Sequence, residues 1–339
     1  MQRISIIGLG LIGGSIGMAL KQAKLKDVEI VGHDREPSAS GKARKRGAVD
    51  KTEWNLLSAV ADAGIVIIAT PVMAIREVME QIAPRLPEDC IVTDTGSTKA
   101  NVMEWAEQYL PASVSFVGGH PMAGKEESGV ENADPNLFRG RTYCVIPGGK
   151  AVASAVQTVV GMVETLGAKP FFLDAPEHDV FVAGVSHLPM VLSAALVSAT
   201  NRSPSWKEMS KLAATGFRDI SRLASGNPEM NRDICVTNQQ GVVHWIDAMI
   251  RELEEYRRLV SECEEDLGRT FIQVWEARER WLKGVETPGA EAAAFAEIPK
   301  ASESFAAMIV GDRLARRSRT LLERQEKAAE GKPWEKPNK

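Results

Sequence analysis

The stretch that most constrains this chain lies at its start, where an apolar run leads into a glycine-rich turn and a helix-favouring segment. Gly8, Gly10 and Gly13 form the pattern G-x-G-x-x-G, and Asp34 ends the next apolar run about 20 residues later. In a strand–turn–helix–strand unit, such glycines let the backbone approach a pyrophosphate, which the helix N-terminus attracts. Because strand, helix and acid all accompany the glycines, the stretch predicts a dinucleotide-binding site rather than a turn without a ligand.

Length and composition limit the class of protein. A chain of 339 residues is too long for one ordinary core and predicts about two domains. The 44% hydrophobic and 25% charged content is typical of a soluble globular protein, and a net charge of −4 gives no electrostatic argument for nucleic acid or an anionic membrane as partner. We expect a cytoplasmic location because no signal peptide precedes the first strand. We expect no metal site because the cysteines lack metal-ligand spacing: Cys90, Cys144, Cys235 and Cys263.

One segment, 180–199, is apolar enough to resemble a membrane span. It contains His187, Pro189 and three serines. We therefore expect a buried helix at a domain or subunit core instead.

The first half of the chain alternates between predicted strands and helices. The strands are expected at 64–69, 90–94, 114–117, 143–146 and 170–173, and helices at 38–46 and 151–166. Pro71 follows the first of these strands and suits the first position of a helix. Continuous apolar runs are typical of parallel strands covered on both faces, so we predict a Rossmann-type, doubly wound α/β domain at residues 1–174.

The pattern becomes wholly helical after Pro176. Apolar residues recur at alternating spacings of three and four along one stretch: Ile246, Met249, Leu253, Tyr256, Val260, Cys263 and Leu267. This spacing predicts one long helix whose seam packs on neighbouring helices, either in its own domain or in a partner subunit. We expect an all-helical substrate and dimerisation domain at residues 175–284, hence a homodimer, followed at 285–339 by a linker and a basic helical tail.

Four loops at the predicted carboxyl ends of strands can hold a ligand: 8–15, 70–74, 94–99 and 118–126. His120 in the last loop lies between Gly-Gly and Pro, where a constrained backbone can aim the imidazole. A histidine that titrates near neutrality suits removal of a proton from a hydroxyl. The alternative is a histidine that only hydrogen-bonds within the turn.

Two further candidates lie in the helical part. His187 is in an otherwise apolar helix, where a lone histidine is more often a core residue than a catalyst. Arg232 can bind a substrate carboxylate through two hydrogen bonds or pair structurally with its neighbour Asp233. The residues alone leave these alternatives open.

Taken together, the motifs resemble those of the prephenate/arogenate dehydrogenases, the TyrA family of tyrosine biosynthesis. They are GLGLIGGS, ATPV, DTGSTK, GGHPMAGKEESGVE, VSHLP and GFRDISRLASGNPEMNRDI, in that order, and the resemblance covers about residues 1–249. GGHPMAG and SHLP are specific to the family, whereas the glycine pattern is not. The resemblance therefore favours functional roles for His120, His187 and Arg232.

The resemblance implies oxidative decarboxylation of prephenate to 4-hydroxyphenylpyruvate with hydride transfer to NAD. His120 would assist deprotonation of the ring hydroxyl, and Ser97 would orient that hydroxyl. Arg232 would bind the side-chain carboxylate, His187 would line the pocket and Glu126 would help to gate the entrance. The chemistry agrees, because an anionic substrate needs a fixed guanidinium and the developing carbonyl needs a positioned base.

The cofactor is expected to be NAD rather than NADP. Asp34 can accept hydrogen bonds from both ribose hydroxyls, whereas a 2′-phosphate would meet its negative charge; the adjacent Arg35 weakens this argument. The predicted cofactor contacts come from the glycine loop, the acid and its neighbour, and the turn after 64–69: Gly8, Gly10, Leu11, Ile12, Gly13, Asp34, Arg35, Thr70 and Pro71.

The chain departs from the family pattern at three points. Met190 stands where several members have histidine, and a thioether cannot donate a hydrogen bond. The choice between prephenate and arogenate, or both in a cyclohexadienyl dehydrogenase, therefore stays open. Lys125 replaces a common small residue near the entrance. No pattern of an appended regulatory or chorismate mutase domain follows Gly284, so any inhibition by tyrosine is expected at the active site.

Two other kinds of function fit the sequence less well. A β-hydroxyacid dehydrogenase of the same two-domain plan would need a catalytic lysine on its first helical-domain helix, and residues 177–200 contain none. A non-catalytic, NAD-binding dimeric sensor would need none of His120, Ser97 and Arg232, yet all three are present.

Overall fold

The computed structural model describes residues 2–125, 127–262 and 264–284. Glu126, the linker and tail predicted at 285–339, and Cys263 of the predicted seam lie outside the described residues.

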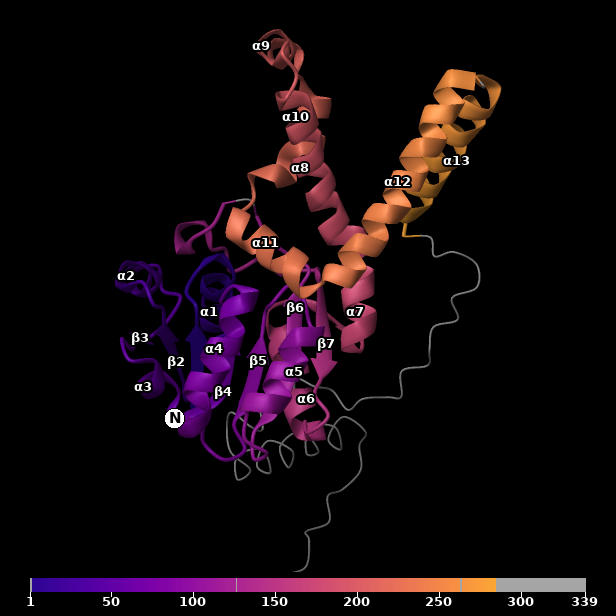
Figure 1. The fold of residues 1–339 in the computed structure, drawn as a ribbon. Helices are drawn as coiled ribbons and strands as arrows, with labels where there is room; N and C mark the ends of the chain where they lie inside the picture. The colour runs from indigo at the N-terminus through magenta and orange to yellow at the C-terminus, as the bar shows by residue number, and fades with distance from the viewer. Residues whose placement is uncertain (1, 126, 263, 285–339) are drawn as a thin grey trace, which may run out of the picture.

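An eight-stranded sheet forms the first part of the molecule, in the order β3-β2-β1-β4-β5-β6-β7-β8 (Figure 1). Every neighbouring pair is parallel except β6 and β7. The strand order reverses between β1 and β4, which creates the crevice where doubly wound sheets bind ligands. The strands are β1 (Gln2–Ile7), β2 (Val28–His33), β3 (Lys51–Thr52), β4 (Ala63–Ile68), β5 (Ile91–Asp94), β6 (Ser115–Pro121), β7 (Thr142–Pro147) and β8 (Lys169–Phe172).

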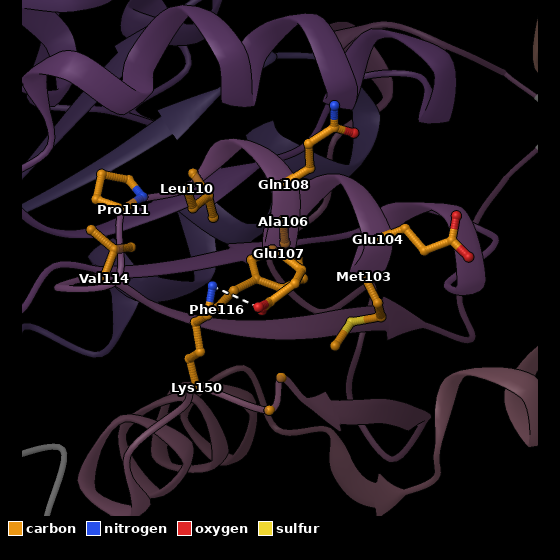
Figure 2. A pocket seen from close by; sticks show the side chains of 12 residues that line it. Met103, Glu104, Ala106, Glu107, Gln108, Leu110, Pro111, Val114, Phe116 and Lys150 are labelled. Carbon is orange, nitrogen blue, oxygen red and sulfur yellow. Dashed lines mark ion pairs between the residues drawn. The ribbon is translucent and has the colours of Figure 1, made fainter.

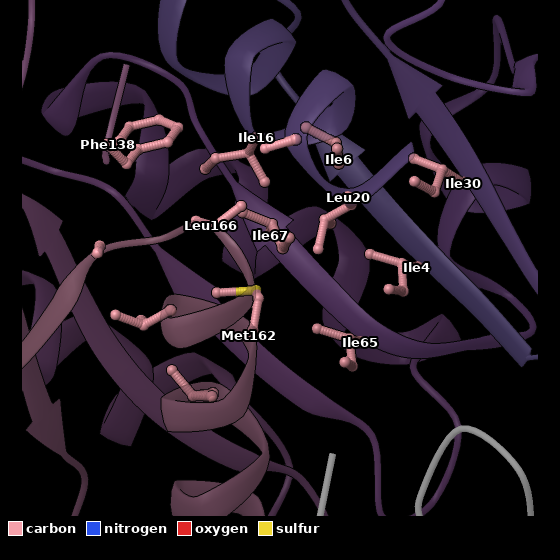
Figure 3. Packing of buried hydrophobic residues seen from close by; sticks show 14 of the residues in the cluster. Ile4, Ile6, Ile16, Leu20, Ile30, Ile65, Ile67, Phe138, Met162 and Leu166 are labelled. Atoms are coloured by element: carbon pink, nitrogen blue, oxygen red, sulfur yellow. The ribbon is translucent and has the colours of Figure 1, made fainter. Parts of the chain in front are cut away.

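Helices cover both faces of this sheet, which explains the continuous apolar runs of its central strands. Ile4 and Ile6 of β1 pack with α1 and α6 on one face (Figure 3), whereas Ile7 packs with α4 and α5 on the other. The predicted doubly wound fold is confirmed. The helices are α1 (Leu11–Gln22), α2 (Pro37–Lys45), α3 (Leu56–Val60), α4 (Val72–Ile82), α5 (Ala100–Tyr109) and α6 (Ala153–Thr165).

The described chain after Phe172 contains helices and no strand, as predicted. In Figure 1 these helices lie beyond the carboxyl ends of the parallel strands and extend outward as two arms, one of α8–α10 and one of α12–α13. They are α7 (Ala175–Val182), a π-helical turn η3 (Ala183–His187), α8 (Leu188–Asn201), α9 (Trp206–Met209), α10 (Thr215–Ser221), α11 (Pro228–Thr237), α12 (Gln239–Glu262) and α13 (Glu264–Leu282).

The single long helix predicted across 246–267 is wrong. The chain forms a hairpin, with α12 ending at Glu262 and α13 beginning at Glu264, and the two helices lie side by side (Figure 1). The rings of Tyr256 and Phe271 are 5.7 Å apart across the hairpin. A heptad pattern needs an apolar neighbour but does not specify whether that neighbour is another chain or the next segment of its own.

The segment from Ala175 to Asn201 is long and apolar enough to cross a membrane by length and composition, with a mean hydropathy of 2.0. Only 28% of its apolar window is buried within the chain. Val185, for example, is 75% exposed. The burial expected for 180–199 is therefore incomplete within one chain, and an apolar surface remains on this helix.

Candidate active site

The glycine loop lies where β1 ends and α1 begins. Gly8 has a φ of +95°, and a Cβ there would lie 2.5 Å from the carbonyl oxygen of Ala69. A Cβ on Gly13 would lie 2.0 Å from the carbonyl oxygen of Gly8. Side chains at these two positions would therefore push the loop away from β4 and α1. No side chain caps α1, whose N-cap is Gly10, so Leu11 and Ile12 begin a helix with free N–H groups.

Asp34 lies directly after β2 and braces this loop. Its Oδ2 accepts a hydrogen bond from the backbone N–H of Leu9 at 2.7 Å, and its Oδ1 accepts one from Glu36 at 2.9 Å. A carboxylate oxygen has two lone pairs, so both oxygens can still accept a ribose hydroxyl. Arg35 next to it is exposed.

The turn after β4 offers an unused polar group beside the same loop. The hydroxyl of Thr70 is buried and has no hydrogen-bond partner, and its methyl group would lie 3.1 Å from a Cβ on Gly8. Pro71 is the N-cap of α4. The prediction that it is the first residue of the helix is therefore wrong by one position. A buried, unpaired hydroxyl and an uncapped helix end fit a dinucleotide, because its phosphates and ribose supply the missing partners.

His120 lies within β6 rather than in a turn after it, so the prediction that this strand ends at 117 is wrong. Antiparallel pairing with β7 extends β6 to Pro121 and places His120 opposite Cys144. A pairing partner some 20 residues away along the chain is invisible to a local pattern. The strand holds the imidazole at the carboxyl edge with only 8% of the residue exposed.

A buried ion pair shapes the loop that carries Ser97. Asp94 and Lys99 are both completely buried and pair with each other. Asp94 also accepts hydrogen bonds from the backbone N–H groups of Gly96 at 2.7 Å and Gly119 at 3.1 Å. The carboxylate thus ties the Ser97 loop to the strand that bears His120, and Ser97 itself is half-buried.

His120 also contacts a second histidine that the sequence did not reveal. Its Nδ1 lies 2.9 Å from Nε2 of His178 on α7, and Nδ1 of His178 lies 2.8 Å from Oδ1 of Asp179. Both oxygens of Asp179 accept backbone hydrogen bonds at the start of α5, from Lys99 at 2.7 Å and Ala100 at 2.9 Å. His178 and Asp179 are neighbours in the sequence and form no recognisable motif. Only the fold shows that they contact His120 and the start of α5.

His120 is held neutral by its surroundings. Burial lowers its pKa well below the ordinary value of 6.5, and the nearby His178, Lys99 and His187 lower it further. A neutral imidazole at physiological pH keeps a lone pair and can accept a proton.

His187 is buried at the end of η3 and has one unpaired nitrogen. Its Nδ1 lies 3.3 Å from the amide nitrogen of Asn238, whereas no group in the described part of the chain hydrogen-bonds to Nε2. Burial lowers its pKa to about 4, although Asp179 and the backbone of Ser97 act in the opposite direction. If His187 were only a core residue, we would expect both of its ring nitrogens to be hydrogen-bonded within the protein. The unpaired Nε2 therefore favours a contact with a ligand. Met190, three residues further on, is also buried.

Arg232 lies on α11 and pairs with its neighbour. Its Nε and Nη2 donate to Oδ1 of the buried Asp233 at 2.9 and 2.6 Å, and its side chain is 63% exposed. The structural pairing considered from the sequence is therefore present. The pairing with Asp233 orients the guanidinium of Arg232 but leaves the N–H groups of Nη1 outside the pair, so that they can bind a ligand.

These groups meet at one edge of the sheet. The hydroxyls of Thr98 and Thr237 are 2.8 Å apart and join the Ser97 loop to α11. The hydrogen bond from Lys99 to Asp179 joins the same loop to α7. Among the described residues, no cluster of three or more histidine, cysteine or acidic side chains is arranged to hold a metal ion.

A hollow of about 550 Å³ lies at the opposite, amino edge of the sheet (Figure 2). It is lined by the C-terminal half of α5, the start of β6 and the turn after β7, and an ion pair of 2.6 Å between Lys150 and Glu107 crosses it. Its walls contain none of the predicted site residues, so we do not assign the reaction to it.

A Rossmann-type domain with an open helix N-terminus, and a neutral histidine buried where a helical domain joins it, define a two-domain, dinucleotide-dependent dehydrogenase. The sequence matches two family profiles, described as the nucleotide-binding domain of prephenate dehydrogenase at 16–171 and its dimerization domain at 174–273. The chain belongs to the prephenate dehydrogenase family.

Individual relatives agree with this assignment. The chain is 38% identical to prephenate dehydrogenase of Bacillus subtilis, over 79% of this chain and 73% of that protein. It is 30% identical to cyclohexadienyl dehydrogenase of Zymomonas mobilis, over 78% and 90%.

Two solved structures are also similar. One is prephenate dehydrogenase of Aquifex aeolicus in complex with hydroxyphenyl propionate and NAD+, with a TM-score of 0.77, 31% identity and coverage of 83% of this chain and 98% of that chain. The other is arogenate dehydrogenase of Synechocystis, with a TM-score of 0.70, 31% identity and coverage of 83% and 100%.

Proposed function

We propose that this protein catalyses the oxidative decarboxylation of prephenate to 4-hydroxyphenylpyruvate in tyrosine biosynthesis, with NAD as oxidant. The observation that carries the proposal is the neutral, buried His120 at the carboxyl edge, between the Ser97 loop and the helical domain. A sensor without catalysis would not need a base held in this way.

In this reaction the imidazole of His120 takes the proton of the ring hydroxyl as the carbonyl forms. Bound NAD supplies the acceptor for the hydride that leaves the same ring carbon. The bond to the ring carboxylate then breaks, carbon dioxide leaves, and the electron pair completes the aromatic ring as a phenolate, which takes the proton back from His120 to give the phenol. The lowered pKa of His120 keeps it ready to accept the proton at neutral pH.

The remaining polar groups bind and orient the substrate. The hydroxyl of Ser97 orients the ring hydroxyl, and the free Nε2 of His187 offers a partner inside the pocket. Arg232, held by Asp233, presents its unused N–H groups to the side-chain carboxylate. Glu126 is proposed to gate the entrance by resemblance to the family alone.

NAD would be held by groups already arranged for it. The N–H groups at the start of α1 would bind the pyrophosphate, and Asp34 would accept the ribose hydroxyls with the lone pairs that Leu9 and Glu36 leave free. Thr70 supplies a buried hydroxyl next to the same loop. We expect Arg35 and Pro71 to contribute only at the margin of the site.

We further propose that two copies associate through the helical domain, with the domains divided near Asp174. The exposed apolar side chains of α12 and α13 support this, because a single chain leaves Leu253, Val260 and Trp275 more than half exposed. A small-molecule substrate and a cytoplasmic location accompany the proposal, and no membrane or nucleic acid is required for it.

Arogenate is the second candidate substrate, and the buried Met190 is the observation that keeps it. A methionine cannot give the hydrogen bond that a histidine gives at this position, so recognition of the polar side chain differs. The experiment measures NADH formation with prephenate and then with arogenate, using the wild type and His120→Ala. We expect turnover by the wild type and a loss of about 10²- to 10⁴-fold in the variant. No turnover of either substrate by the wild type overturns the proposal.

A further inference from the structure

We propose that His178 and Asp179 are positioning residues that fix the tautomer of His120 and leave its Nε2 free as the proton acceptor. The inference deepens the proposed function and rests on it for the kinetic part only. Neither residue belongs to the motifs that indicated the site, and both lie on α7, whereas His120 lies on β6.

The chain of hydrogen bonds has one direction, and it starts at Asp179. The carboxylate is 5% exposed and can only accept hydrogen bonds when ionised. The N–H groups of Lys99 and Ala100 at the start of α5 hold both of its oxygens, and the helix dipole favours negative charge there. Nδ1 of His178, 2.8 Å from Oδ1, must therefore carry the proton.

This orientation determines the next bond. When His178 carries a single proton, on Nδ1, it has a lone pair on Nε2, which lies 2.9 Å from Nδ1 of His120. One of these two nitrogens must supply a hydrogen, so Nδ1 of His120 carries it. The two rings meet edge to face, at 67° with centroids 5.1 Å apart, which suits an in-plane N–H directed at a lone pair. The remaining nitrogen of His120, Nε2, is then unprotonated.

The same chain stabilises His120 after it accepts a proton. When the hydroxyl proton of the substrate moves to Nε2, the imidazolium keeps its Nδ1–H bond to His178, whose far side faces the carboxylate of Asp179. No second proton has to move. This arrangement parallels the aspartate that holds a catalytic histidine in hydrolases, with one imidazole inserted.

Other charged or titratable groups surround His120, and none of them replaces this partner. Lys99 and His187 lower its pKa, while Asp94 is paired with Lys99. Tyr143 and Cys144 lie on the neighbouring strand β7, and burial raises the pKa of both, so they stay neutral. Among the residues that the structure describes, only Asp179, through His178, brings a negative charge into the hydrogen-bond chain of the base.

Kinetics of two variants test the inference. His178→Phe keeps a flat ring but removes the acceptor, and we expect kcat to fall about 10²- to 10⁴-fold with KM within about twofold. His178→Gln offers an amide oxygen that can accept the same hydrogen, and we expect it to regain about tenfold or more of the loss. Trp245→Phe removes the hydrogen bond of 3.1 Å from Trp245 to the carbonyl of Val180 on α7, the helix that carries His178, and should change kcat by no more than about twofold.

Several kinetic outcomes would overturn the inference. Wild-type kcat in His178→Phe would do so. Equal losses in all three variants, or a KM that rises in step with the fall in kcat, would mean that His178 only holds the domains together.

Nitrogen NMR of histidine-labelled wild type, without substrate, tests the tautomer directly. We expect the Nδ1 of His120 to be protonated and its Nε2 to be unprotonated above pH 7, and a proton on Nε2 would overturn the inference. This measurement decides even if the Phe variant fails to fold. Because it requires no turnover, it also separates failure of the inference from failure of the proposed function.

Discussion

The carboxylate of Asp179 accepts hydrogen bonds from the backbone at the start of α5, with Oδ1 2.7 Å from the nitrogen of Lys99. One residue of the helical segment thus caps α5, the helix that follows the Ser97 loop. Ser97, the loop's predicted catalytic serine, is therefore positioned by both domains. Because residues from both domains form the proposed site, we expect substitutions at their contacts to change both the rate of the reaction and the free energy of unfolding.

Arg232 is expected to act through substrate binding. Arg232→Ala should raise KM for the substrate about 10- to 100-fold, the effect of losing hydrogen bonds to a charged group. Arg232→Lys should restore little, because an ammonium lacks the planar pair of donors. Arg3→Lys, which changes an arginine paired with Glu29 at the amino end of β1, is the matched control and should leave KM unchanged. Steady-state kinetics that show normal KM in Arg232→Ala would contradict the assignment.

Asp34 is expected to decide between NAD and NADP. Asp34→Ser removes the charge that repels a 2′-phosphate and should raise the ratio of NADP to NAD use. The change should also weaken NAD binding, because the carboxylate braces the loop through Leu9 and Glu36. Initial rates with both cofactors measure the effect. An unchanged preference would remove Asp34 from this role.

His187 should make stability depend on pH. Its folded pKa of about 4 lies below the ordinary value of 6.5. Between these values the unfolded chain binds the proton and the folded chain does not, so stability falls as pH falls through this window, by at most about 1.4 kcal/mol per pH unit. Above the window neither state is protonated and the contribution is constant. Urea unfolding at several pH values should give a shallower decline for His187→Asn than for the wild type, and parallel declines would count against the assignment.

Two helical glycines form a matched pair for packing. A Cβ on Gly17 of α1 would lie 2.1 Å from the carbonyl oxygen of Ala48, whereas one on Gly41 of α2 would have nothing within 4 Å. Gly17→Ala should therefore destabilise the protein by about 1–3 kcal/mol through overpacking. Gly41→Ala should be neutral or stabilise it by about 0.5–1 kcal/mol, because alanine favours a helix. Urea unfolding distinguishes the two, and equal midpoints would show that α1 can shift to make room.

Local features of the sequence determined the dinucleotide loop, the apolar strands and the wholly helical second half. The glycine-rich turn, the helix that follows it and the apolar run of β4 can each be recognised from residues within a few positions of one another. Motif resemblance added His120, Ser97, His187 and Arg232 as candidates. Glu126 belongs to the same motifs but lies outside the described residues, so its role stays a prediction.

The tertiary structure decided the rest. Antiparallel pairing with β7 made His120 part of a strand, and packing of α13 against α12 divided the heptad seam between two helices of one hairpin. The partner of His120 is His178, 58 positions away, and the bond exists because α7 folds back onto the sheet edge. Periodicity and capping act over a few residues, whereas a hydrogen bond between buried side chains depends on where separate elements come to rest. Motif resemblance therefore predicted His120 as the base, whereas the proposed choice between its two nitrogens rests on contacts that only the fold creates.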